Sequence, residues 1–165
     1  YDTSNRQGSY SVAHSGLGDI NGHPQNGLDG STSTNNSNSW HWNNNSTPIN
    51  NMYINFDLGS GNSKIYTGGK ILQDRVQSCG TWKFQGSNDG SNFTDLSASF
   101  VWGSGSGNVT AATWSNNVAY RYLFLRGVSG NSHSSPWQTE FQFRSKTGSV
   151  TYNATGSFEG NAITA

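Results

Sequence analysis

The clearest chemical signal in this sequence is a set of tryptophan, histidine and asparagine side chains that lie among small polar residues. A carbohydrate site needs a flat apolar ring that stacks on the C–H face of a sugar, with planar or charged side chains that reach its hydroxyl groups. The segment from Ser129 to Trp137 places Asn131, His133 and Trp137 within nine residues. We therefore predict that this segment is part of a carbohydrate-binding site.

Other residues along the chain offer the same chemistry. The candidate stacking platforms are Trp42, Trp102 and Trp137, and the candidate polar partners are His41, Arg75, Asn131, His133 and Gln138. Core packing is the alternative for the tryptophans. Trp82 is predicted to lie in the core because its strand neighbours alternate correctly, and either Trp40 or Trp42 is expected there too. For Trp137, stacking on a sugar and capping the core are equally compatible with the sequence.

Motifs for catalysis are missing from the sequence. It has neither the Gly-x-Ser-x-Gly pattern of a serine hydrolase nor the His-Glu-x-x-His pattern of a zinc peptidase. Cys79 is the only cysteine, which rules out an intramolecular disulfide, and it is predicted to be a small buried hydrophobic residue. A glycosidase needs two carboxylates across a cleft, and several of the nine acidic residues fall in predicted turns or strands. We therefore predict a protein that is not an enzyme.

The charge of the chain disfavours some classes of binding partner. The 165-residue chain has a formal net charge of zero, and only 11% of its residues are charged. Nucleic-acid binding and polybasic membrane binding both need an excess of lysine and arginine, so both are disfavoured. No apolar run is long enough to span a membrane, and the first ten residues lack the pattern of a signal peptide. The low charge and the abundance of Asn, Ser, Thr and Gly are typical of extracellular or virion-surface proteins that handle sugars.

Alternating side chains predict strands rather than helices. In residues 52–58, Ile54 and Phe56 face one side and Asn55 and Asp57 the other, as in a half-buried antiparallel strand. Strands are predicted over residues 52–58, 64–72, 81–86, 93–97, 100–102, 119–126 and 137–144. Because 13% of the residues are aromatic, we expect an aromatic core in an all-β antiparallel sandwich.

One predicted hairpin has the most specific pattern. Trp82 and Phe84 form the apolar face of a strand that runs into Asn88-Asp89-Gly90, where Asp and Gly supply the turn. The segment Trp82–Leu96 resembles the hallmark hairpin of the coagulation factor V/VIII C-type, or discoidin, domains and of the related family 32 carbohydrate-binding modules. Four further segments resemble that family in the right order: Leu28-Asp29-Gly30 with Thr34, Ile54–Gly59, Tyr120–Leu125 and Trp137–Phe143.

This resemblance covers residues 19–144 and implies a jelly-roll β-sandwich of the galactose-binding-like type with about eight strands. It also implies a structural calcium ion that ties the first loop to the last strand. The side-chain ligands would be Asp29, Thr34 and Glu140, and backbone carbonyls from residues 26–31 would complete the oxygen shell that calcium prefers.

The family pattern also bears on sugar binding. Arg75 follows the predicted strand 64–72, where sugar-binding members often have an arginine that binds hydroxyl groups. Two positions depart from the pattern. Ser31 stands where the family commonly has a second Asp, and an insertion at residues 35–39 shifts the tryptophans that follow it.

The predicted organisation is one discoidin-like domain over residues 1–146. Residues 147–165 would then be a terminal strand, a linker or the start of a neighbouring module. Residues 31–51 are almost wholly polar and are predicted to form a long surface loop.

The leading hypothesis is a non-catalytic module that recognises galactose-like or related glycans through loops at one end of the sandwich. Such a module would ordinarily belong to a larger secreted enzyme, an adhesin or a phage tail protein. The alternative is a structural or protein-contact domain of such an assembly that keeps the fold and binds no sugar. Lipid binding through apolar loop tips is a third hypothesis, which the neutral net charge disfavours.

Overall fold

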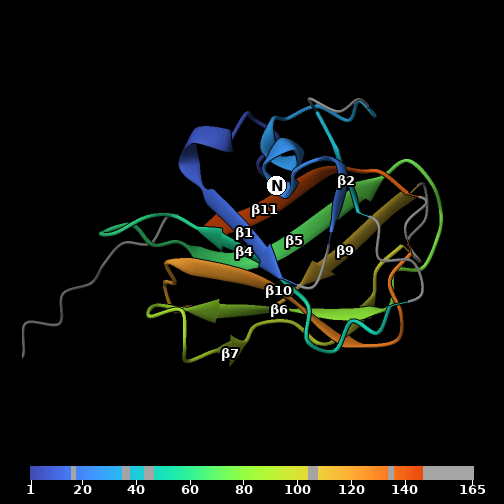
Figure 1. Ribbon diagram of the computed structural model, residues 1–165. Coiled ribbons are helices and arrows are strands. Elements are labelled where there is room, and N and C mark those ends of the chain that lie inside the picture. Colours follow the sequence, from blue (N-terminus) through green and yellow to red (C-terminus); the bar gives the residue numbers. More distant parts are fainter. Residues whose placement is uncertain (16–17, 35–37, 43–46, 104–107, 134–135, 147–165) are drawn as a thin grey trace, which may run out of the picture.

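The molecule is an all-β sandwich of two antiparallel sheets with two short 3₁₀ helices (Figure 1). The computed structural model describes residues 1–15, 18–34, 38–42, 47–103, 108–133 and 136–146. The predicted fold class is confirmed. The predicted tail, residues 147–165, lies outside the described residues.

Six strands form the first sheet and five form the second. The first sheet has the order β1 (Ser11–Ser15), β4 (Tyr53–Asp57), β10 (Tyr122–Ser129), β6 (Thr81–Ser87) and β7 (Thr94–Asp95), with β8 (Phe100–Val101) also paired to β6. The second sheet has the order β2 (Asp19–Gly22), β3 (Trp40–Trp42), β11 (Gln138–Lys146), β5 (Ile65–Gln73) and β9 (Val109–Thr113). The helices are η1 (Gln7–Ser9) and η2 (Pro24–Leu28), and neither is long enough to cross a membrane; no other helix lies in the described ranges.

The seven predicted strands are all present, with ends that differ by a few residues. In β4, Ile54 and Phe56 are fully buried, as the alternation predicts. In β11 the pattern is less simple, because Gln138 and Glu140 are buried as well as Phe141 and Phe143. Both faces of this strand are therefore covered.

Four strands were not predicted, namely β1, β2, β3 and β9. Three of them are sheet edges, where one side of the strand has no neighbour, and their sequences contain few large apolar residues. The prediction of a long surface loop over residues 31–51 is corrected by β3, which is a strand within that range. The described residues contain eleven strands rather than about eight, because several are only two or three residues long.

Four tryptophans form the centre of the core at one end of the sandwich. The rings of Trp42 and Trp82 stack with centroids 6.2 Å apart, and Trp102 meets them edge-on at 4.8 and 5.1 Å. Trp40 contacts Trp42 at 5.0 Å. The predicted core role of Trp82 is confirmed. Cys79 is buried beside this cluster, and burial raises the pKa of its thiol to about 12, which makes it the small inert residue that was expected.

The hairpin between β6 and β7 has the predicted turn. Gly90 has a φ of +74°, in the region that glycine adopts without strain. The carboxylate of Asp89 accepts hydrogen bonds from the backbone N–H groups of Ser91 and Asn92, both at 2.8 Å. These bonds favour the ionised form and lower the pKa of Asp89. In this turn Gly90 therefore supplies the positive φ, and Asp89 supplies the hydrogen-bond acceptor.

Candidate functional site

Three neighbouring strands of the second sheet bring the best candidate residues together. In the middle strand β11, Gln138 pairs with Trp40 of β3 on one side and with Gln73 of β5 on the other. The residues next to these three positions are His41, Trp137 and Asp74. Strand register therefore places parts of the chain that are far apart in sequence at one end of one sheet.

A stacked pair of rings forms the middle of this site. The imidazole of His41 and the indole of Trp137 have centroids 4.9 Å apart and an interplanar angle of 25°. His41 lies on the outer side of β3, because its neighbours Trp40 and Trp42 both point into the core. Both members of the pair are half-buried, so part of each residue is open to solvent.

Asp74 holds Trp137 in place through the backbone. The Trp137 N–H donates to a carboxylate oxygen of Asp74 at 2.8 Å, and the Asp74 N–H donates to the Trp137 carbonyl at 3.1 Å. The side-chain amide of Asn108 donates to the Asp74 carbonyl at 2.8 Å. Three segments are thereby joined, and the aromatic platform is fixed before any ligand arrives.

Arg75 projects into solvent next to this pair. Its side chain is 61% exposed, and its Nε lies 3.4 Å from a carboxylate oxygen of Asp74. The backbone of Arg75 is held in the turn, because its carbonyl accepts hydrogen bonds from Gln77 N–H at 3.1 Å and from the Gln73 side chain. The guanidinium is therefore anchored at its base and retains N–H donors for a ligand.

The electrostatics of the site favour a neutral His41. Burial lowers its pKa, Arg75 adds to that shift, and Asp74 works against it. A neutral imidazole has one donor and one acceptor nitrogen, so it can tell hydroxyl orientations apart.

Two of the predicted stacking platforms are corrected by the structure. Trp42 is 0% exposed and donates its indole N–H to the carbonyl of His133, and Trp102 is equally buried. Neither ring can reach a sugar, because each is enclosed by the other core tryptophans. Gln138 is also fully buried and donates to the Pro136 carbonyl at 3.0 Å, so it does not face solvent.

Asn131 and His133 lie on the loop between β10 and β11. Asn131 is exposed and forms a β-bridge with Pro48, and the neighbouring Ser132 N–H donates to Thr47 at 2.8 Å. The carbonyl of His133 accepts from the core indole of Trp42. These contacts connect the loop to residues 47–49 and to the core rather than to the stacked pair.

The predicted calcium ligands are only partly assembled. The Gly30 N–H donates to Glu140 at 3.3 Å, which brings the first loop against the last strand as expected. Thr34 is exposed, and the two carboxylate oxygens of Asp29 accept from Ser31 N–H at 2.7 Å and from the Asn38 side chain.

A residue that the sequence patterns did not indicate, Arg6, occupies the centre of this region. Its guanidinium forms an ion pair with Glu140 and donates to the Phe141 carbonyl at 2.7 Å. Burial raises the pKa of Glu140, and the adjacent Arg6 works against that rise. In this arrangement the residues do not fit a calcium ion unless Arg6 moves away. Calcium binding at Glu140 therefore stays a prediction, and it requires that Arg6 moves away.

No protein-family model matches the sequence, and no curated protein matches it. Solved structures do match. A family 32 carbohydrate-binding module of AlyQ, in complex with 4,5-unsaturated mannuronic acid, is 25% identical, with 81% of this chain and 93% of that chain covered and a TM-score of 0.58. The module CpGH89CBM32-5 from Clostridium perfringens, in complex with GalNAc-β-1,3-galactose, is 17% identical, with coverages of 85% and 98% and a TM-score of 0.62.

A third match is chitosan-binding module 1 from a chitosanase/glucanase of Paenibacillus sp. IK-5, which is 18% identical, with coverages of 82% and 95% and a TM-score of 0.59. The same fold also occurs inside longer chains, such as a truncated AlyQ with an alginate lyase domain, of which this chain covers 32%. With two antiparallel sheets in the order described above, the chain has the discoidin-like, galactose-binding-type β-sandwich fold of the family 32 carbohydrate-binding modules.

Proposed function

We propose that this domain is a non-catalytic carbohydrate-binding module that recognises galactose-like or related glycan residues at the cluster of His41, Arg75 and Trp137. The observation that supports this most is the stacked pair of His41 and Trp137 beside the exposed guanidinium of Arg75. A ring surface next to hydrogen-bond donors is the combination that a sugar needs. Several structures of this fold contain a bound sugar, which favours the same use here.

Each residue has a distinct part in the proposed site. Trp137 supplies the apolar surface on which the C–H face of the sugar packs, and Arg75 donates hydrogen bonds to hydroxyl groups. His41 supports the indole and selects hydroxyl orientation through its neutral ring. Asp74 is a positioning residue, since it fixes Trp137 without needing to touch the ligand.

Asn131 and His133, on the neighbouring loop, remain predicted contacts for an adjacent part of the glycan. His133 is expected to change which sugar is preferred more than whether a sugar binds. Because the site is open, binding to a single sugar is weak, and firm attachment needs several copies on one enzyme or particle. We place the module in an extracellular, multidomain protein, as part of the same proposal.

A glycan array tests the proposed function, with bound ligands then measured by calorimetry. Trp137→Ala and Arg75→Ala should each weaken binding by at least about 1 kcal/mol, which is several-fold in affinity. Val76→Ala is the matched control, because Val76 is 61% exposed on the same turn and offers no polar group. If the unsubstituted domain binds no glycan in millimolar calcium, the protein-contact alternative replaces this proposal. Equal losses in all three variants would also contradict it.

A further inference from the structure

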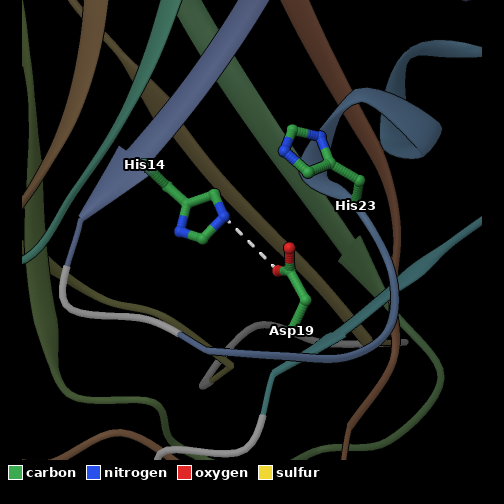
Figure 2. A group of neighbouring side chains, drawn as sticks. All are labelled: His14, Asp19 and His23. Atoms are coloured by element: carbon green, nitrogen blue, oxygen red, sulfur yellow. Dashed lines mark ion pairs between the residues drawn. The ribbon is translucent and has the colours of Figure 1, made fainter.

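Two histidines and an aspartate meet where the edges of the two sheets come together (Figure 2). His14 lies on β1, the edge strand of the first sheet, and Asp19 begins β2, the edge strand of the second. His23 follows β2 directly and is the residue that caps η2. Figure 2 shows the three side chains pointing toward a common space. None of these residues belongs to the carbohydrate site proposed above.

The distances within this cluster are close to those of a metal site. One ligand atom from each residue lies within 4.8 Å of the other two. The Nε2 of His14 is 3.4 Å from an Asp19 carboxylate oxygen. In a tetrahedral zinc site with bonds of about 2.0 to 2.1 Å, neighbouring ligand atoms are about 3.3 to 3.4 Å apart. The distance between His14 and Asp19 already matches such a site, and the other two ligand distances, which are no longer than 4.8 Å, must shorten when an ion binds.

The surroundings orient two of the three ligands. The indole N–H of Trp40 donates to the same carboxylate oxygen of Asp19, which is the kind of outer contact that fixes metal-binding carboxylates. The rings of His14 and Trp40 are 5.5 Å apart, so the buried tryptophan forms one wall of the site. The Nε2 of His14 faces Asp19, whereas its Nδ1 is buried without a hydrogen-bond partner in the described residues, so Nε2 is the nitrogen that can reach an ion.

The third ligand must give up one hydrogen bond. The Nδ1 of His23 accepts from the Gln25 N–H at 3.2 Å. A metal ion on Nε2 would require a proton on Nδ1, so ion binding and this helix cap compete. Metal binding should therefore change the environment of the Gln25 amide.

We propose that His14, Asp19 and His23 bind a divalent transition-metal ion of the zinc type. Two imidazoles and one carboxylate suit zinc, whereas calcium prefers an all-oxygen shell. Water completes the coordination. The ion clips the two edge strands of the sandwich together and so stabilises the folded domain by mass action.

The test is zinc titration of the full chain, free of any affinity tag, by calorimetry. We expect one zinc ion per chain, and each of His14→Gln, His23→Gln and Asp19→Asn should weaken zinc binding at least about tenfold. Asp19→Asn keeps an oxygen that can accept from Trp40. The chain has four histidines, so the double variant His41→Gln/His133→Gln is the matched control and should bind zinc like the unsubstituted protein.

NMR of the unsubstituted protein gives a readout that depends on no variant. Zinc should shift the ring signals of His14 and His23 and the Gln25 amide signal, and should leave the ring signals of His41 and His133 in place. The proposal is overturned if no zinc binds, if the three cluster variants bind zinc as well as the unsubstituted protein does, or if zinc shifts only the other two histidines.

Discussion

Two of the carboxylate–arginine pairs in this domain, Glu140 with Arg6 and Asp74 with Arg75, differ chiefly in burial. Glu140 and Arg6 are 0% and 3% exposed in their side chains, and the pair joins the N-terminal segment to the last strand. Asp74 and Arg75 are 17% and 61% exposed, and the pair lies at the end of the sheet beside Trp137. One carboxylate–arginine pair thus stabilises the fold, and the other lies in a candidate binding site.

Dielectric surroundings explain the contrast. A buried charge that loses its partner remains desolvated, which is costly, while an exposed charge that loses its partner is solvated by water. Arg6 therefore cannot be removed without a large loss of stability. Arg75 can be removed at little cost, which leaves it available for a ligand.

The largest effect is expected for the buried pair. Arg6→Ala should lower the free energy of unfolding by about 3 to 5 kcal/mol, because Glu140 is left buried without a counter-charge. Arg75→Ala should change it by no more than about 1 kcal/mol. Urea denaturation of both variants measures the difference. Equal costs for the two substitutions would contradict the distinction between a structural and a functional pair.

Calcium gives a second test of the buried pair of Arg6 and Glu140. Because Arg6 already neutralises Glu140, we expect calcium to raise the melting temperature of Arg6→Ala more than that of the unsubstituted protein. At about 100 times the Kd, the gain would be about 2.7 kcal/mol. Thermal melts with calcium and with chelator check this. The same response in both proteins would show that ion and arginine do not compete, and no response in either would remove calcium from the domain.

At the exposed pair the expected loss is in binding rather than in stability. Asp74→Ala removes the acceptor of the Trp137 backbone N–H and leaves only the bond from the backbone N–H of residue 74 to the Trp137 carbonyl, so the indole is held less firmly. We expect glycan affinity to fall several-fold, by about 1 kcal/mol. Lys83→Ala, on the outer face of β6, is the control, since Lys83 pairs with Asp95 away from this site. Unchanged affinity in Asp74→Ala would mean that Trp137 needs no support from that carboxylate.

A turn remote from both pairs should affect stability alone. Gly90→Val forces a β-branched residue into a positive φ and should cost about 1 kcal/mol or somewhat more. An added Cβ makes only ordinary van der Waals contact with the ring of Tyr122, 3.7 Å away, so the cost is backbone strain. Chemical denaturation measures this cost, and glycan titration should be unchanged. A loss of affinity would show that the hairpin and the binding site are coupled.

The smallest effect is a pH dependence at the stacked pair. The folded-state pKa of His41 lies below its ordinary value, so the unfolded chain binds more protons between the two values. Stability should therefore be complete above about pH 6.5 and fall as the pH drops below it. His41→Gln should reduce this slope in denaturation curves measured at several pH values. An unchanged slope would assign the effect to His23, whose pKa is also lowered.

The sequence determined those features that depend on neighbouring residues. Alternation within residues 52–58 placed Ile54 and Phe56 in the core, and the Asp89-Gly90 pair located a turn with a positive φ. These are local preferences of the backbone and of side-chain period, so they can be read without knowing the fold. The family-like order of the segments then indicated the discoidin-like sandwich.

Exposure of each aromatic ring was decided only by the tertiary structure. Trp42 and Trp137 looked alike in sequence, but Trp42 on β3 points into the core and is buried, whereas Trp137 lies half-buried at the end of the sheet, just before β11. The short edge strands β1, β2 and β9 also escaped prediction, since they contain little apolar alternation and depend on a neighbouring strand.

The partner of Glu140 likewise came from the tertiary structure. Arg6 is 134 positions away, and nothing in the spacing of the chain connects the two. The cluster of His14, Asp19 and His23 is local in sequence, yet its residues meet only because the edges of two sheets come together. Local preference determines which strand or turn a segment forms, whereas burial and charge pairing depend on which distant segments pack against it.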